Sequence, residues 1–135
     1  MTDTTAPMQI NLMRYGLIYG GATFVLALLP QMLGLNAAYG ITVALPPLIG
    51  SIVEGQAYAK AQGARVRGEP AWRGALIMAV LGAAIYIVVA GVLLMAVSRQ
   101  QAVALPILQM LGGFVVLFGI QFLLNRLGLR LAPER

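Results

Sequence analysis

The sequence contains neither cysteine nor histidine, and only 10% of its 135 residues are charged. The first two absences exclude disulfide bonds, thiolate nucleophiles, imidazole bases and most zinc, iron or copper sites, because cysteine and histidine supply those groups. A soluble domain usually carries about 25% charged residues, so this chain has too little charge to cover a water-exposed surface. We therefore expect no enzymatic activity, no bound metal and no cofactor.

Apolar residues dominate instead, at 60% of the sequence with a mean hydropathy of +0.87. A helix that crosses a membrane needs about 20 predominantly apolar residues. The sequence predicts a single transmembrane domain over residues 1–135, an all-α membrane protein whose four-helix bundle consists of two helical hairpins. The first apolar run is longer than the 7–15 residues typical of a signal peptide, so we expect it to stay as a membrane anchor. The predicted transmembrane helices are 15–35, 41–59, 74–97 and 103–127.

The basic residues are distributed unevenly around these predicted helices. Eight of the nine Lys and Arg residues precede the first helix, lie in the predicted loop 60–73 or lie at or after the end of the fourth helix, and only Arg99 lies on the other side. Because Lys and Arg concentrate in cytoplasmic loops, both termini and this loop are predicted to be cytoplasmic, in a bacterial inner membrane. Membrane orientation thus accounts for the net charge of +5, and we expect no nucleic-acid partner. The predicted rim that attracts anionic lipid headgroups comprises Arg14, Lys60, Arg65, Arg67, Arg73, Arg126 and Arg130.

Glu54 is the one acidic residue inside a predicted transmembrane helix. A charge at such a position costs about 2.5–3.5 kcal/mol unless it is paired, hydrated or protonated. Arg14 or Arg73 could reach it from the rim. The group could be a proton-linked binding site or a structural node between helices, and its place near the cytoplasmic edge favours the structural interpretation. Polar residues at a similar depth predict a buried polar cluster of Glu54, Tyr58, Tyr19, Gln121 and Asn125.

Small residues recur at helical spacing in several of the predicted helices. Helices associate in lipid through close packing of small residues, so such positions predict helix contacts. We favour packing within one bundle over a dedicated homodimer face. The phenylalanines of the fourth helix recur every four residues and could face lipid, fill the bundle or receive a partner helix. The predicted helix-contact face comprises Gly16, Gly20, Ser51, Gly55, Phe114, Phe118 and Phe122.

The segment from Glu54 to Arg65, followed by Glu69 to Arg73, resembles the central loop of an uncharacterised family of small four-helix bacterial inner-membrane proteins. The resemblance spans nearly the whole chain and implies an architecture rather than an activity. A coarser similarity links the chain to the small multidrug resistance transporters, which have a similar length, four helices and one essential membrane glutamate. In that family the glutamate belongs to the first helix, where this chain has no acid, so no catalytic role is transferred.

These observations predict a non-enzymatic integral membrane protein. The expected role is that of an accessory or interaction subunit in a larger inner-membrane assembly, or that of a homo-oligomer. The alternative is a proton-coupled small-molecule transporter that acts as a dimer through Glu54.

Overall fold

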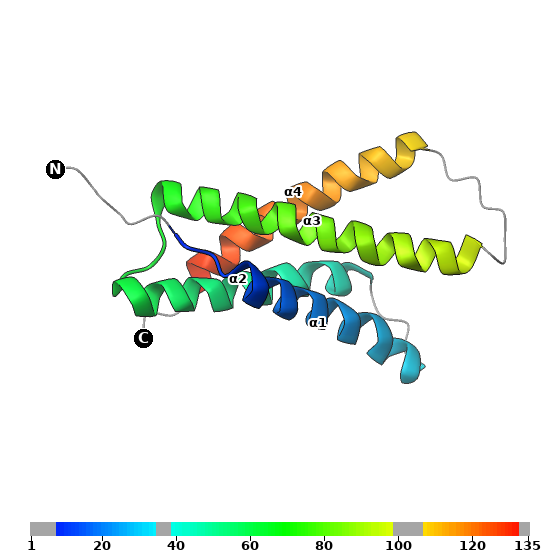
Figure 1. Ribbon diagram of the computed structural model, residues 1–135, viewed down its shortest axis with the longest axis horizontal. Coiled ribbons are helices and arrows are strands. Elements are labelled where there is room, and N and C mark those ends of the chain that lie inside the picture. The colour runs from blue at the N-terminus through cyan, green and yellow to red at the C-terminus, as the bar shows by residue number, and fades with distance from the viewer. Residues whose placement is uncertain (1–7, 35–38, 99–106, 133–135) are drawn as a thin grey trace.

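The computed structural model describes residues 8–34, 39–98 and 107–132, and all regular structure among them is α-helical. α1 begins and α4 ends at the same end of the molecule, where α2 also passes into α3 (Figure 1). We call this the basic end, because it carries all seven described Lys and Arg side chains, which are those of the predicted rim. The helices are α1 (Leu12–Met32), α2 (Tyr39–Gln62), α3 (Gly68–Ser98) and α4 (Ile107–Leu131).

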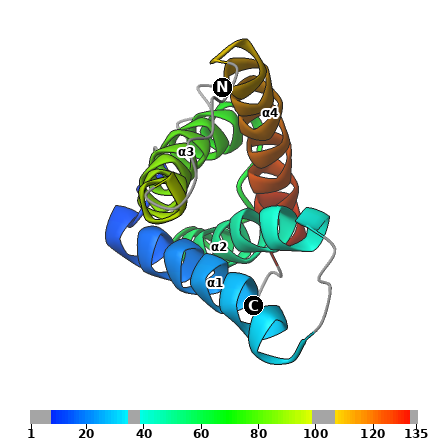
Figure 2. The ribbon, with the colours of Figure 1, turned by 90° about the vertical axis from the view of Figure 1, so that its right-hand side faces the viewer.

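The helices follow the order α1, α2, α4, α3 around the bundle (Figure 2). α1 packs against α2 and α3, and α4 also packs against α2 and α3. α1 and α4 are therefore diagonal partners, and only long side chains that cross the middle of the bundle can join them.

The bounds of all four helices differ from the predicted ranges. α1 begins at Leu12 rather than at residue 15, and α4 ends at Leu131 rather than at residue 127. The prediction marked the stretches expected to lie in hydrocarbon and stopped at Arg14 and before Arg130, whereas the helices continue through these charged residues. Residue 35 and residues 103–106 of the predicted helices lie outside the described part of the chain.

The loop between α2 and α3 is also shorter than the predicted range 60–73. Only residues 63–67 lie between the two helices. Gly63 ends α2 with a φ of 67° and donates its backbone N–H to the Ala59 carbonyl oxygen at 2.8 Å, an arrangement that favours glycine. Pro70 lies in the first turn of α3, where its missing N–H leaves no hydrogen bond unmade.

Three of the described helices are long and apolar enough to cross a membrane, where the sequence predicts four. These stretches are Leu12–Pro30, Gly68–Val89 and Leu111–Leu131. α2 does not meet the criterion over its described residues, because two prolines, Ser51, Glu54 and Lys60 lower its hydropathy.

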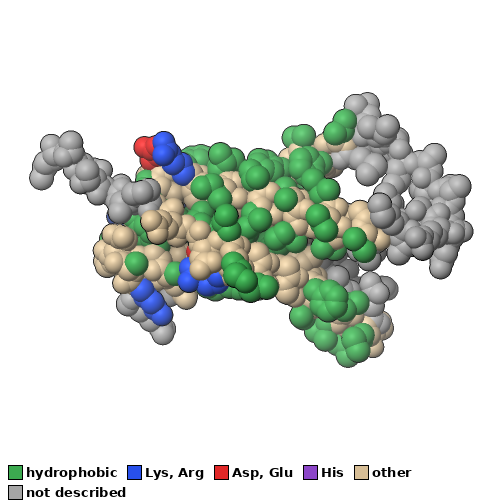
Figure 3. Space-filling model, viewed as in Figure 1, with side chains coloured by type: hydrophobic (Ala, Val, Ile, Leu, Met, Phe, Trp, Pro, Cys, Tyr) green, Lys and Arg blue, Asp and Glu red, His purple; other side chains and the backbone are tan. Residues whose placement is uncertain are grey.

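Buried side chains concentrate toward the basic end. The core there includes Tyr15, Val66, Met78 and Leu129, all nearly inaccessible. Toward the other end α1 and α4 diverge (Figure 1), and many of their large apolar side chains are exposed. Hydrophobic side chains cover much of the middle of the visible face, while charged ones gather at the basic end (Figure 3). This distribution is that of a bundle solvated by lipid around its middle and by water at one end.

The contact between α2 and α4 depends on small residues. A Cβ added at Gly128 would collide with the Ser51 side chain and lie 2.9 Å from the Leu48 carbonyl oxygen, and one at Gly55 would lie 2.7 Å from the Ala132 Cβ. The Ser51 hydroxyl donates to the Pro47 carbonyl oxygen at 2.7 Å, so it is satisfied within its own helix. The two backbones approach closely because neither side carries bulk.

We expect Gly128→Ala to lower the free energy of unfolding by about 1–3 kcal/mol, because the added methyl group forces α2 and α4 apart. Gly119→Ala is the matched control on the same helix, where no described atom lies within 4 Å of an added Cβ. Thermal unfolding in detergent, followed by circular dichroism, measures both. Equal stability of the two variants would contradict this description of the α2–α4 contact.

Candidate functional site

Arg14 of α1 and Glu54 of α2 form an ion pair with two hydrogen bonds. Arg14 Nε donates to Glu54 Oε1 at 2.6 Å, and Arg14 Nη2 donates to Glu54 Oε2 at 2.9 Å. The Glu54 side chain is 1% exposed and that of Arg14 is 39% exposed. Such paired contacts between a guanidinium and a carboxylate are strong and fix the orientation of both groups. The pair therefore neutralises the buried acid and ties α1 to α2.

Asn11 joins this ion pair to the start of α1. Its side-chain Oδ1 accepts the backbone N–H of Arg14 at 3.0 Å, which caps the first turn of the helix. Its own backbone N–H donates to Glu54 Oε2 at 3.2 Å. In a capping box an acid of the same helix accepts this N–H, and here a neighbouring helix supplies the acid. Glu54 thus fixes both the position of α1 and the place at which it begins.

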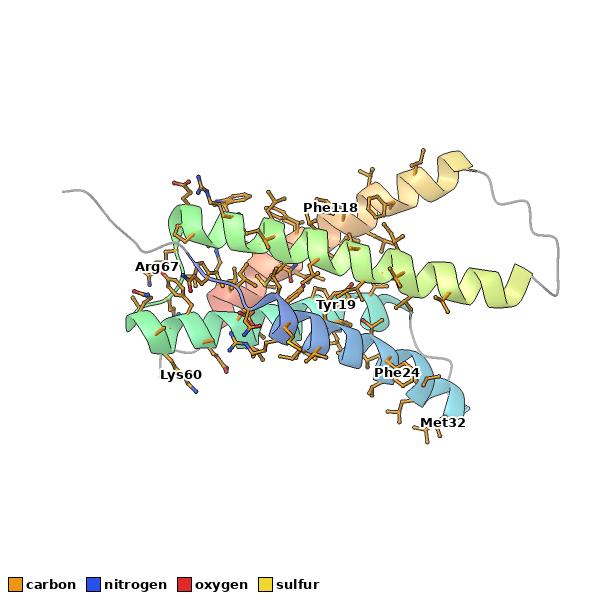
Figure 4. The ribbon with its side chains drawn as sticks, in the orientation of Figure 1. Tyr19, Phe24, Met32, Lys60, Arg67 and Phe118 are labelled. Atoms are coloured by element: carbon orange, nitrogen blue, oxygen red, sulfur yellow. The ribbon has the colours of Figure 1, made fainter. Side chains whose placement is uncertain are left out.

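Two tyrosines of α1 reach across the bundle to α4. The Tyr15 hydroxyl donates to Asn125 Oδ1 at 3.0 Å, and Gln121 Nε2 donates to the Tyr19 hydroxyl oxygen at 2.6 Å. The two tyrosines lie four residues apart on α1, and the two amides lie four residues apart on α4, which is about one helical turn in each case. The chain runs in opposite directions along these helices, so each tyrosine meets one amide. They form a two-rung ladder between the diagonal helices, and Figure 4 shows Tyr19 directed into the interior.

Two glycines of the intervening helices make room for the tyrosine rings. A Cβ at Gly50 of α2 would lie 2.7 Å from the Tyr15 ring, and one at Gly82 of α3 would lie 3.1 Å from the Tyr19 ring. The rings themselves lie 5.8 Å apart between centroids. The ladder thus depends on all four helices, although its hydrogen bonds join only α1 and α4.

The predicted polar cluster divides into two parts in the structure. Glu54, Tyr19, Gln121 and Asn125 are all buried, but Glu54 binds Arg14 and Asn11, whereas the two amides bind tyrosines. Tyr58 is half-buried and lines an open pocket of about 440 Å³ beside Arg14.

Tyr15 was not among the predicted cluster residues, because its place at the start of α1 also suits a membrane-interface anchor. The sequence does contain a signal that Tyr15 belongs to the cluster. Tyr15 and Tyr19 are four residues apart, as are Gln121 and Asn125. Of the two arginines predicted to reach Glu54, Arg14 does so. Arg73 instead pairs with Glu69 at 2.7 Å on the exposed surface of α3.

The predicted helix-contact residues also separate into different environments. Ser51 and Gly55 lie inside the α2–α4 contact. Gly16 and Gly20 make no close contact of this kind. A Cβ added at Gly16 first meets Ile85 at 3.9 Å, and one added at Gly20 meets no described atom within 4 Å. The phenylalanines form a graded series on α4, in which Phe122 packs on Trp72 at 5.4 Å between ring centroids, Phe118 is half-buried and Phe114 is exposed.

The predicted rim is likewise not one uniform band. Arg14 turns inward to Glu54, and Arg73 is held by Glu69. Lys60 extends from α2 into solvent (Figure 4). The remaining four arginines converge on one pocket, which they share with Trp72.

Substitution of either partner should reveal which side of the Arg14–Glu54 pair is buried. Arg14→Gln leaves an unpaired carboxylate in the interior, and we expect it to lower the free energy of unfolding by about 3 kcal/mol. Glu54→Gln should cost only about 1 kcal/mol, because the Arg14 side chain can turn to water and the amide oxygen can still accept from Asn11. Unfolding in detergent measures both, and the reverse order would show that the pair is not arranged as described.

The chain has no significant match among protein-family models, curated proteins or solved structures. Its functional interpretation therefore depends on the geometry. Among the described residues, no group of three or more acids is placed to hold a metal ion. The polar side chains that cross the bundle bind one another, which is the behaviour of a structural node between helices.

Proposed function

We propose that this chain is a non-enzymatic integral protein of the bacterial inner membrane that acts by lateral association, as an accessory subunit of a larger assembly or as a homo-oligomer. The observation that carries the proposal is the small-residue face of α1 around Gly20, which packs against none of the described residues of its own bundle. In the interior, Glu54, Gln121 and Asn125 each bind a side chain of another helix, while Gln121 Oε1 and Asn125 Nδ2 have no hydrogen-bond partner among the described residues.

The proposed topology has four transmembrane helices in two hairpins, with both termini in the cytoplasm. The start of α1, the α2–α3 connection and the end of α4 share the basic end, and the positive-inside rule places such an end in the cytoplasm. α2 is polar for a membrane helix, but it packs between α1 and α4. Polar and proline-containing backbone is tolerated at membrane depth where protein covers it.

The α1 face has the composition of a helix–helix interface. Leu17 is 68% exposed and Phe24 is 66% exposed, and they flank the notch formed by Gly20 and Gly21, beside which no described atom comes within 4 Å of an added Cβ. Met13 continues the exposed stripe one turn earlier. Small residues between large ones allow two helices to approach closely in lipid, where the hydrophobic effect supplies no driving force.

The alternative, a proton-coupled transporter acting through Glu54, is less well supported by this geometry. Such a transporter needs a carboxylate that exchanges a proton for a substrate cation. Glu54 accepts three hydrogen bonds, two from Arg14 and one from the Asn11 backbone, so that both of its oxygens are occupied. A bound arginine already takes the place that a substrate cation would need.

Because the chain contains no cysteine, a single introduced cysteine reports one position only. In oxidised native membranes, Leu17→Cys should form a disulfide-linked homodimer or a defined adduct with one partner. Val80→Cys, which lies on α3 and is 55% exposed, is the matched control and should stay uncrosslinked.

The second arm uses Gly20→Leu, which fills the notch, and Gly112→Leu, which adds the same bulk to α4 where no described atom is within 4 Å of an added Cβ. After extraction in mild detergent, Gly20→Leu should abolish association with the stoichiometric partner or with another copy of the chain. Gly112→Leu should leave that association intact. A solitary monomer in the wild type, or unchanged association of Gly20→Leu, would refute the proposal.

A further inference from the structure

Each rung of the ladder between α1 and α4 leaves one amide atom unpaired. Asn125 accepts from the Tyr15 hydroxyl through Oδ1, and its Nδ2 has no hydrogen-bond partner among the described residues. Gln121 donates to the Tyr19 hydroxyl oxygen through Nε2, and its Oε1 has no such partner either. Gln121 is 2% exposed and Asn125 is fully buried. The interior of the bundle thus contains one unpaired donor and one unpaired acceptor.

Reversal of either amide group does not remove the unpaired atoms. A reversed Asn125 would donate to the Tyr15 hydroxyl through Nδ2 and leave Oδ1 unpaired. A reversed Gln121 would accept from the Tyr19 hydroxyl through Oε1 and leave Nε2 unpaired. Each amide has both a donor and an acceptor, whereas each rung offers it a single hydroxyl. The mismatch therefore follows from the residue types, and a buried polar atom without a partner is unfavourable.

The two unpaired atoms belong to side chains that one small molecule can bridge. Gln121 and Asn125 are four residues apart on α4, and side chains at this spacing have Cβ atoms about 5–6 Å apart on the same face of a helix. A water molecule with two hydrogen bonds of about 2.8–3.0 Å each spans a similar distance. Such a water can accept from Asn125 Nδ2 and donate to Gln121 Oε1 at the same time.

The Tyr19 hydroxyl offers the same water a third partner. Its oxygen accepts from Gln121 Nε2 at 2.6 Å, and its own proton is a donor. Buried water molecules typically make about three hydrogen bonds. The two amides and this hydroxyl together supply that number.

The neighbouring face of α3 packs against the ladder without completing it. A Cβ added at Gly82 would lie 3.0 Å from Gln121 Oε1, so the unpaired acceptor lies against α3 at this glycine. The buried side chains around Gly82 on the same helix are those of Met78, Ala79 and Ala83. These side chains have no N–H or O–H group, so they cannot donate to the acceptor.

We propose that the ladder contains a binding site for one long-lived water molecule, which bridges Gln121 and Asn125 and joins the two rungs into a single hydrogen-bonded network. Folded proteins hold on the order of one buried water per 27 residues, where it satisfies polar groups that otherwise have no partner. The site lies inside one bundle, so it does not require lateral association through α1.

Magnetic relaxation dispersion of the water oxygen counts the water molecules that stay inside a protein, and exchanging hydroxyl protons do not contribute to it. The full chain in uncharged detergent is compared with a ladder-free variant and with Gln62→Met, which removes an exposed amide of α2. We expect the ladder-free variant to lose about one long-lived water per chain and Gln62→Met to lose none. The ladder-free variant carries Tyr15→Phe, Tyr19→Phe, Gln121→Met and Asn125→Leu.

Replacement of both partners of a buried hydrogen bond by apolar groups of similar shape can be nearly neutral for stability, so the ladder-free variant should fold, and circular dichroism checks this. The place of the water is tested without that variant. Cross-relaxation between water protons and isotope-labelled side-chain amides in the wild type should give a bound-water signal at Asn125 Nδ2 and only a surface-water signal at Gln62. The Asn125 signal should persist in Tyr15→Phe, which removes the hydroxyl proton that could relay it.

Three results would each overturn the proposal. The first is the absence of a bound-water signal at Asn125 in the wild type, which is expected if the two amides bind each other directly in a dry interior. The second is loss of that signal in folded Tyr15→Phe. The third is a folded ladder-free variant that holds as many long-lived water molecules as the wild type.

Discussion

The ion pair between Arg14 and Glu54 is the constraint on which the rest of the bundle depends. A carboxylate buried inside a helix bundle is costly unless it is paired, and here the pairing recruits both the side chain of Arg14 and the backbone of Asn11. The start of α1 is thereby fixed against α2. That register brings Tyr15 and Tyr19 opposite Asn125 and Gln121, so one buried acid determines how two diagonal helices meet.

These polar contacts lie in the half of the molecule toward the basic end, and the fold is correspondingly one-sided. The core residues and the glycines that admit the tyrosine rings are found there, while α1 and α4 diverge beyond it. Lipid supplies no force that would draw apolar helices together, so side chains without a polar or small-residue contact stay exposed. Lateral association is proposed along α1 from Met13 to Phe24, at the depth of the polar ladder, and four arginines line a pocket at the basic end.

The sequence predicted the helical class and the burial of Glu54, Gln121 and Asn125, because apolar length and position along a helix indicate these features. It did not predict that Tyr15 binds Asn125, since this depends on the rotation of α1 about its axis and on the diagonal position of α4. It treated Arg67 and Arg126 as parts of one rim, because spacing along the chain does not show that a connection and a distant helix end converge. The four-helix topology and its orientation stay predictions.

Distances between spin labels test the one-sided bundle most directly. With no native cysteine, pairs can be placed on α1 and α4 in liposomes, at Met13 and Leu127 near the polar ladder and at Val25 and Val115 beyond it, all of which are exposed. We expect a narrow distance distribution for the first pair and a longer, broader one for the second. Equally narrow distributions, or a broad one for Met13 and Leu127, would contradict the claim that buried polar contacts hold this protein together at one end.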